Sequence, residues 1–123
     1  MNKFLDSKRD HFYLLFRVII GLLFLMHGWM KVSGIISGSL EVMSLMGLAA
    51  LIEVVGGLFV IVGFQTRFTA VVAGIEMLVA FFMVHATQGL NPLANNGEPA
   101  VLFFAAFLVL VAFGARRWSV DKK

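Results

Sequence analysis

Residues 42–87 read VMSLMGLAALIEVVGGLFVIVGFQTRFTAVVAGIEMLVAFFMVHAT, two long apolar runs divided by the polar residues Gln65, Thr66 and Arg67. A helix needs roughly 20 mainly apolar residues to cross a bilayer, and the runs at about 42–64 and 68–87 both meet that length. Three residues leave room only for a tight turn, so the two segments should be antiparallel neighbours. This stretch therefore predicts a hairpin of two transmembrane helices.

Two further apolar runs flank this hairpin, at about residues 12–30 and 99–114. Residues 33–39, rich in Ser and Gly, are predicted to form the first loop, and residues 88–99 contain the helix breakers Asn91-Pro92 and Asn96-Gly97. The last apolar run is short, but Pro99 suits the first turn of a helix. The sequence therefore predicts an all-α, polytopic integral membrane four-helix bundle that forms one domain over residues 1–123.

The composition supports a membrane protein. Hydrophobic residues make up 60% of the chain, its mean hydropathy is +0.94, and only 14% of it is charged. A water-soluble domain of 123 residues could not bury that much apolar surface. The net charge of +3 comes from Lys and Arg near the two ends, and no basic stripe points to nucleic acid. The absence of Cys excludes disulfide exchange, thiolate catalysis and Cys-ligated metal sites.

Lys and Arg are unevenly distributed among the tails and loops. Lys31 stands alone in the first loop, and the third loop has neither residue type. Cytoplasmic segments of membrane proteins carry an excess of Lys and Arg, so we expect a cell-membrane protein with both termini and the second turn in the cytoplasm. The basic residues on that side are Lys3, Lys8, Arg9, Arg67, Arg116, Arg117, Lys122 and Lys123.

Several polar residues fall inside or beside the predicted spans. A charge near the bilayer centre costs on the order of 2.5–3.5 kcal/mol on insertion scales, so such side chains should face the bundle interior and find partners. At about 1.5 Å of rise per residue, their depths form a series from one side of the membrane to the other. The candidates for a polar interior or ligand-binding site are Arg17, His27, Lys31, Glu53, Glu76, His85 and Glu98.

Helical periodicity predicts where these side chains point. Arg17 shares a face of its helix with Gly21, and Glu53 shares one with Gly57, so a neighbouring helix could approach closely there. Glu76 and His85 are nine positions apart, which places them on opposite sides of an α-helix. Those two residues could face one interior only if the helix bends or ends early.

The charged groups allow three interpretations. Arg17 could form a buried ion pair with Glu76 or Glu53 that locks helices together. One of the two acids could instead be protonated, because burial and a neighbouring acid both favour the neutral form. His27 and His85 lie at similar depth and could in principle be axial ligands of a b-type haem. Two histidines are a weak signal for haem, however, and interfacial hydrogen bonds explain them more simply; no other metal site is indicated.

A series of short motifs runs along the whole chain. In order they are LLFR (14–17) with Gly21, HGxxK (27–31), ExxGG (53–57), GFxTR (63–67), His85, NGE (96–98) and the tail GARRWSVD (114–121). This order resembles the DoxX family of small four-helix membrane proteins. In the tail, Ala115 and Arg116 stand where the family has Pro and Gly, a departure that concerns only the geometry of the turn there.

The resemblance implies a class of protein and no set of catalytic residues. Some relatives are subunits of thiosulfate:quinone oxidoreductase, others associate with redox-stress enzymes at the membrane, and distant eukaryotic relatives act in receptor assembly. The first hypothesis is a redox-associated membrane subunit that binds a quinone or a small lipophilic ligand and partners a soluble or membrane oxidoreductase. The alternatives are a non-enzymatic assembly or docking protein for another membrane protein, and a proton-coupled carrier that would need to form a homo-oligomer.

Overall fold

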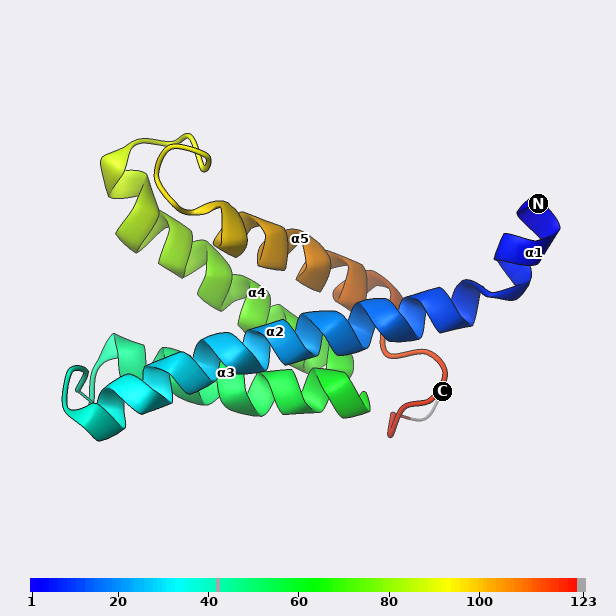
Figure 1. Cartoon of the computed structure of the whole chain (residues 1–123), viewed down its shortest axis with the longest axis horizontal. Helices are drawn as coiled ribbons and strands as arrows, with labels where there is room; N and C mark the ends of the chain where they lie inside the picture. The colour runs from blue at the N-terminus through cyan, green and yellow to red at the C-terminus, as the bar shows by residue number, and fades with distance from the viewer. Residues whose placement is uncertain (42, 122–123) are drawn as a thin grey trace.

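The computed structural model describes residues 1–41 and 43–121, and all secondary structure within them is helical. Val42, with which the predicted second span begins, and the basic residues Lys122 and Lys123 lie outside the described residues. The elements, shown in Figure 1, are α1 (Asn2–Ser7), α2 (Arg9–Ser37), α3 (Leu45–Val62), α4 (Thr66–Ala80), the π-helical turn η1 (Phe81–His85), the 3₁₀ turn η2 (Ala86–Gln88) and α5 (Glu98–Phe113).

Three helices in the described part of the chain are long and apolar enough to cross a membrane. They are α2 with 29 residues, α3 with 18, and the continuous segment Thr66–Gln88 with 23. The apolar helix α5 has 16 residues, slightly fewer than the roughly 17–25 residues of a typical transmembrane helix. At about 1.5 Å per residue it is about 24 Å long. The all-α class is confirmed, and the helices are those of a membrane protein.

The helices form two antiparallel pairs. α2 packs along α3, α4 packs along α5, and the α3–α4 contact is smaller than either. Figure 1 shows that the two pairs meet near the end of the molecule that holds both termini and diverge toward the opposite end. The molecule is therefore a wedge of two helical hairpins, one formed by α2 and α3 and the other by α4 and α5.

Facing glycines allow α2 and α3 to approach closely. A Cβ atom on Gly21 would lie 2.9 Å from the carbonyl oxygen of Gly57, and a Cβ atom on Gly57 would lie 2.7 Å from that of Gly21. A Cβ on Gly28 would meet the backbone nitrogen of Val54 at 2.7 Å. The predicted glycine-bearing faces of the first two spans are thus confirmed as buried contact faces.

An aromatic and aliphatic core holds the two hairpins together. Phe24 of α2 and Val60 of α3 are fully buried there together with Phe107 and Leu110 of α5. The rings of Phe24 and Phe107 meet edge to face, with 4.8 Å between centroids, a favourable geometry for aromatic pairs. This core lies where the two pairs meet, whereas the opposite ends of the hairpins are apart (Figure 1).

Several helix boundaries differ from the predicted ones by two or more residues, and α1 was not predicted; two of the differences have a clear physical cause. α2 continues to Ser37, so most of the loop expected at residues 33–39 is helical. The true stop is Gly38, whose φ of 86° is a left-handed conformation that ends helices and that glycine adopts at low cost. The third helix begins at Thr66, two residues earlier than expected, because its first backbone amides are capped by the C-terminal tail, as described below.

Candidate functional site

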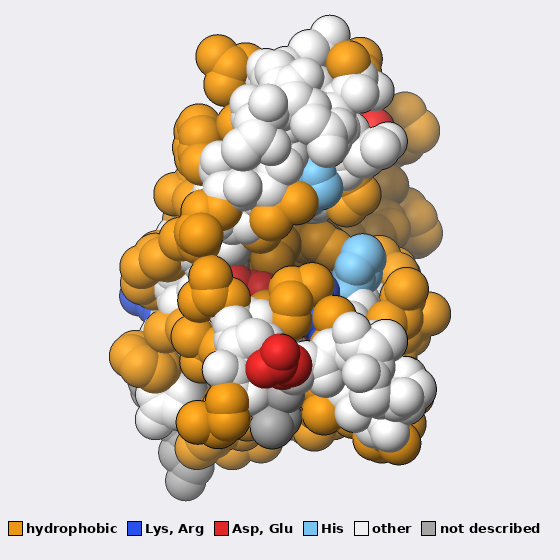
Figure 2. All heavy atoms as spheres, turned by 90° about the vertical axis from the view of Figure 1, so that its left-hand side faces the viewer, with side chains coloured by type: hydrophobic (Ala, Val, Ile, Leu, Met, Phe, Trp, Pro, Cys, Tyr) orange, Lys and Arg blue, Asp and Glu red, His pale blue; other side chains and the backbone are white. Residues whose placement is uncertain are grey.

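The space between the diverging hairpins contains a pocket of about 660 Å³. It lies between α3 and the second half of α4, with Phe24 of α2 and Phe103 of α5 in its wall, and most of its lining is apolar. Figure 2 views this end of the molecule and shows a hollow with histidine and acidic side chains beside it. Small-molecule sites are typically apolar clefts of about 300–1,000 Å³ with a few polar groups, so this pocket has the dimensions and the character of one.

Five of the seven predicted site residues line this pocket. They come from four different elements: α2 supplies two, and α3, α4 and η1 supply one each. The pocket does not include Arg17 or Glu98. The five residues are His27, Lys31, Glu53, Glu76 and His85.

Lys31 and Glu53 form an ion pair across the α2–α3 contact. The Lys31 ammonium donates to Glu53 Oε1 at 2.8 Å, and the Glu53 side chain is only 2% exposed. The close approach at Gly28, where an added Cβ would lie 2.8 Å from the Glu53 Cβ, brings α3 within reach of a lysine one turn further along α2. Glu53 is therefore neutralised by Lys31, and its predicted pairing with Arg17 is wrong.

Glu76 of α4 lies in the same wall as this ion pair. Its carboxyl is within hydrogen-bond reach of the Glu53 carboxyl, but carboxylate oxygens are acceptors and such a contact contains no donor unless a proton is present. Glu76 Oε1 is buried and has no hydrogen-bond partner among the residues that the structure describes. The predicted pairing of Glu76 with Arg17 is likewise wrong.

A change of helix type brings His85 to the pocket that Glu76 also lines. The α-helix ends at Ala80, and residues 81–85 continue as a π-helix, whose wider i→i+5 turn rotates each residue by a smaller angle. This is the early helix end that the sequence required if both side chains were to face one interior. The Nδ1 atom of His85 lies 3.1 Å from the backbone oxygen of Asn95, which holds the ring against the following loop.

Asn95 organises that loop, and the sequence did not single it out. Its side chain is buried, donates to the Gly89 carbonyl at 2.7 Å and accepts from the Gly97 amide at 2.8 Å. The only signal for it was the neighbouring Asn96-Gly97 pair, which predicted a turn and no more. The loop from residue 89 to residue 97 thus positions His85 and contributes Asn96 to the lining of the pocket.

His27 lines the pocket from α2. Its ring packs edge to face against Phe103, with 5.3 Å between centroids. His27 and His85 therefore share a pocket, as their similar depth suggested. Within residues 1–41 and 43–121, His, Asp and Glu form no group of three suited to a metal ion.

Arg17 lies at the other end of the molecule, near the termini. Arg17 is 1% exposed, and its guanidinium donates to backbone carbonyls and forms no ion pair with an acid within residues 1–41 and 43–121. This arrangement joins the C-terminal end of α3, where helix carbonyls lack partners, to the chain that follows α5. The acceptors are Val60 at 3.0 Å, Ile61 at 3.3 Å, Ala115 at 2.6 Å, Arg117 at 3.2 Å and Trp118 at 2.7 Å.

The C-terminal tail also caps α4. The Asp121 carboxylate accepts hydrogen bonds from the backbone amides of Gln65 at 2.7 Å and Thr66 at 2.9 Å. Burial alone would raise the pKa of Asp121, but these amides and the nearby Arg17 guanidinium outweigh it and lower the pKa below its ordinary value. Asp121 was noted in the sequence only as part of the tail motif, and the structure shows that it is the N-terminal cap of a helix 55 residues earlier.

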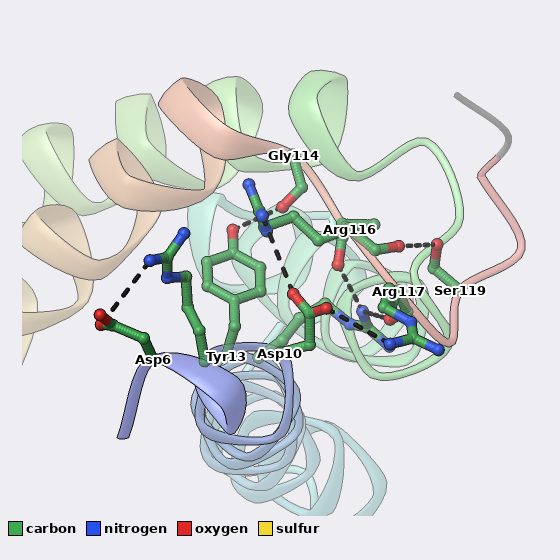
Figure 3. Close-up of polar contacts among 10 residues, drawn as sticks. Asp6, Asp10, Tyr13, Gly114, Arg116, Arg117 and Ser119 are labelled. Carbon is green, nitrogen blue, oxygen red and sulfur yellow. Dashed lines mark hydrogen bonds and ion pairs between the residues drawn. The ribbon is translucent and has the colours of Figure 1, made fainter. Parts of the chain in front are cut away.

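Figure 3 shows how the start of α2 meets the same tail. Asp10 lies between two tail arginines, 3.8 Å from Arg116 and 3.5 Å from Arg117. The Tyr13 hydroxyl donates to the backbone oxygen of Gly114. These contacts, together with those of Arg17, make the termini end of the molecule a structural lock, distinct from the pocket at the other end.

Glu98, the last of the predicted site residues, stands at the start of α5 and is exposed. A negative side chain in the first turn is favourable because the N-terminus of a helix carries a partial positive charge. This placement gives Glu98 a role in the helix end, outside the pocket.

Known proteins resemble this chain along most of its length. The DoxX family model matches residues 12–86. A protein of Haemophilus influenzae is 33% identical, with 97% of this chain and 95% of its own length aligned. The "Inner membrane protein YqjF" of Escherichia coli is 33% identical over 86% of each chain. The Bacillus subtilis protein named "Putative oxidoreductase CatD" is 30% identical over 88% of this chain and 83% of its own length. No solved structure matches the chain.

Proposed function

The chain belongs to the DoxX family of membrane proteins, and from that premise we propose that it is a redox-associated membrane subunit that binds a quinone or another small lipophilic ligand between its hairpins. The pocket is the observation that carries this proposal. It combines an apolar lining with one polar wall, formed by Lys31, Glu53 and Glu76. A flat, apolar ring system with a few oxygen atoms would match both parts of that surface.

The position of the pocket supports a ligand that arrives from the bilayer. Its lining includes side chains that are themselves exposed on the outer surface of the bundle, such as Leu48 of α3, Ile75 of α4 and Met83 of η1. In a membrane those side chains would contact lipid. The name of the Bacillus subtilis relative, which contains the word oxidoreductase, supports the redox part of the proposal.

The test is binding of a short-chain benzoquinone to the purified protein in lipid nanodiscs, followed by thermal unfolding. A ligand at 100 times its Kd should stabilise the fold by about 2.7 kcal/mol. Ala80→Trp places an indole in the pocket lining and should abolish this stabilisation, whereas Ala105→Trp, at an exposed position of α5 outside the pocket, should preserve it.

Mass spectrometry of molecules extracted from the purified protein provides an independent measurement. A co-purified quinone that is absent from the Ala80→Trp variant would support the proposal. If neither quinones nor other lipophilic molecules bind, and pocket variants retain function in cells, the protein is instead an assembly or docking component for another membrane protein.

We further propose that α5 completes a fourth span and that both termini lie in the cytoplasm. Both ends of the described chain lie at the same end of the molecule (Figure 1), as an even number of crossings requires. The Lys and Arg excess at that end, which includes Arg67, Arg116 and Arg117, supports the cytoplasmic side. Reporter domains fused to either terminus should both be active in the cytoplasm, and a periplasmic signal from one of them would contradict this topology.

A further inference from the structure

Three charged side chains from three helices meet in one wall of the pocket. Lys31 of α2 donates to Glu53 of α3 at 2.8 Å, and Glu76 of α4 lies beside Glu53. The other titratable groups that face the pocket are His27 of α2 and His85 of η1, and α5 contributes only apolar side chains. The wall therefore contains one lysine and two acids, which would leave one negative charge in excess if both acids were ionised.

The cations described within residues 1–41 and 43–121 do not balance that excess charge at Glu76. The Lys31 ammonium is engaged by Glu53, and Arg17 is bound to backbone carbonyls at the far end of the molecule. Within the described part of the chain, Glu76 Oε1 is buried without a hydrogen-bond partner, and the neighbouring Glu53 carboxylate is itself an acceptor and cannot donate to it. Two adjacent carboxylates in an apolar environment repel each other strongly. One added proton would remove the repulsion and supply the missing donor.

We propose that Glu53 and Glu76 share one proton and form, with Lys31, an electrically neutral proton-binding site in the pocket wall. The proton resides mainly on Glu76, because Lys31 stabilises the negative charge of Glu53. From this position the carboxyl group can give its proton to an oxygen atom of a molecule in the pocket and take the same proton back from that atom in the reverse step. The site depends on the three side chains alone, so it stands whether or not the pocket binds a quinone.

The test is the infrared C=O stretching band of a protonated carboxyl group, measured on the full chain at pH 7 without added ligand, in micelles of dodecyl maltoside, a detergent that contains no carbonyl group. Wild-type protein should show one such band, because the proposed site holds a single shared proton and an acidic side chain in contact with water is ordinarily ionised at pH 7. Glu76→Gln should remove the band. Glu98→Gln, at an exposed position, is the matched control and should leave it unchanged.

Two further variants test the charge balance. In Glu53→Gln, Lys31 becomes available to Glu76, so the band should disappear. In Lys31→Met, both acids lose their counter-charge and both should be protonated, so the band area should increase about twofold. Wild-type protein without the band, a band that survives Glu76→Gln, or a band that Lys31→Met leaves unchanged would each overturn the proposal. Circular dichroism verifies the fold of each variant, and Lys31→Met decides the matter if Glu76→Gln fails to fold.

Discussion

Arg17 illustrates how a charged side chain can be buried in a membrane protein through hydrogen bonds to backbone carbonyls. Its guanidinium has five N–H donors in a planar fork, and five backbone carbonyls around it accept hydrogen bonds. Two of these carbonyls belong to the end of α3, where the helix dipole carries a partial negative charge. At the scale of the residue, Arg17 therefore contributes to stability and has no direct role in the pocket.

Replacing Arg17 should destabilise the fold. Arg17→Met should lower the free energy of unfolding by about 3 kcal/mol or more, since each buried carbonyl left without a donor costs about 1–3 kcal/mol. Arg17→Lys should recover only part of the loss, because an ammonium cannot reproduce the guanidinium fork. Thermal unfolding in detergent measures both. Arg9→Met is the control, since Arg9 is exposed and lies 3.7 Å from the exposed Asp6; an equal loss there would contradict the argument.

The sequence predicted that Arg17 is buried but assigned it the wrong partners. Glu53 and Glu76 were the visible candidates because side-chain acids can be read from the sequence, whereas backbone carbonyls look the same at every position. Which carbonyls are free depends on where α3 ends and on where the tail returns, and both are properties of the folded chain. Lys31 was recognised as a site residue, but its contact with Glu53 depends on the close helix approach at Gly28.

At the scale of the element, the C-terminal tail determines where α4 begins. Asp121 caps the helix start through the amides of Gln65 and Thr66, and the backbone amides of Val120 and Asp121 donate to the carbonyls of Val62 and Gly63. The tail thus satisfies both the end of α3 and the start of α4. A turn of three residues needs this support, because two helix ends meet there with unpaired backbone groups.

Removing the cap should weaken α4 in a pH-dependent way. Asp121→Ala should lower the free energy of unfolding by about 1 kcal/mol, the usual cost of a lost N-terminal cap. The pKa of Asp121 in the fold is lowered, so its stabilisation is present above the unfolded value of about 3.9 and is lost as the pH falls through the folded value. As the pH is lowered, the thermal unfolding midpoint of the wild type should therefore fall more steeply than that of Asp121→Asn. Parallel curves would contradict this.

The contact between α2 and α3 at their glycines should be sensitive to any added side-chain atom. Gly57→Ala places a Cβ 2.7 Å from the Gly21 carbonyl oxygen, so the helices must separate, at a cost of about 1–3 kcal/mol for overpacking. Gly74→Ala is the matched control, because a Cβ there meets its nearest neighbour at an ordinary 3.8 Å. Thermal unfolding should show a clear loss for Gly57→Ala and little change for Gly74→Ala. Similar losses of stability in both variants would mean that the close approach of α2 and α3 does not explain the effect of Gly57→Ala.

The elements themselves were largely predictable because long apolar runs are an unambiguous signal. The π-helical turn from Phe81 to His85 was not predictable. Its sequence, FFMVH, contains no Gly or Pro that would mark a break. The contact between His85 and the Asn95 carbonyl holds this turn in place from a loop ten residues later, so its position follows from tertiary structure and not from local preference.

At the scale of the whole molecule, two tightly packed hairpins are joined at one end and separated by a pocket at the other. The α2–α3 and α4–α5 contacts are extensive, and those between the pairs are smaller. Motions that move one hairpin relative to the other therefore disturb fewer contacts than motions within a hairpin. The width of the pocket is the quantity that such a motion would change.

Ligand binding should bring the hairpins closer together. Spin labels on Leu48→Cys in α3 and Met83→Cys in η1, which line opposite sides of the pocket, should show a shorter and narrower distance distribution when a benzoquinone is bound. The chain has no native Cys to interfere. Labels at Leu22 and Leu58, two exposed positions within the α2–α3 hairpin, should not respond. A distribution across the pocket that is identical with and without ligand would contradict hairpin closure.

The pocket could be only partly inferred from the sequence. Polar residues in apolar spans predicted a functional interior, and five of the seven candidates do line the pocket. The sequence did not predict that Arg17 lies away from the other candidates. Residue spacing gives the depth of each side chain in the membrane, but it does not predict which helices pack together and which diverge. That divergence depends on how the hairpins pack at the termini end.

The acceptors of Arg17 have a consequence for the order in which the protein is made. The carbonyl of Val60 lies 43 positions after Arg17 and that of Trp118 lies 101 positions after it. Since chains are synthesised from the N-terminus, the first helix enters the bilayer with a cation whose partners do not yet exist. Each later segment supplies some of them, and the tail supplies the last. The hydrogen bonds of Arg17 are therefore complete only when the tail has returned to the first helix, and a chain without the tail leaves part of the guanidinium without those acceptors.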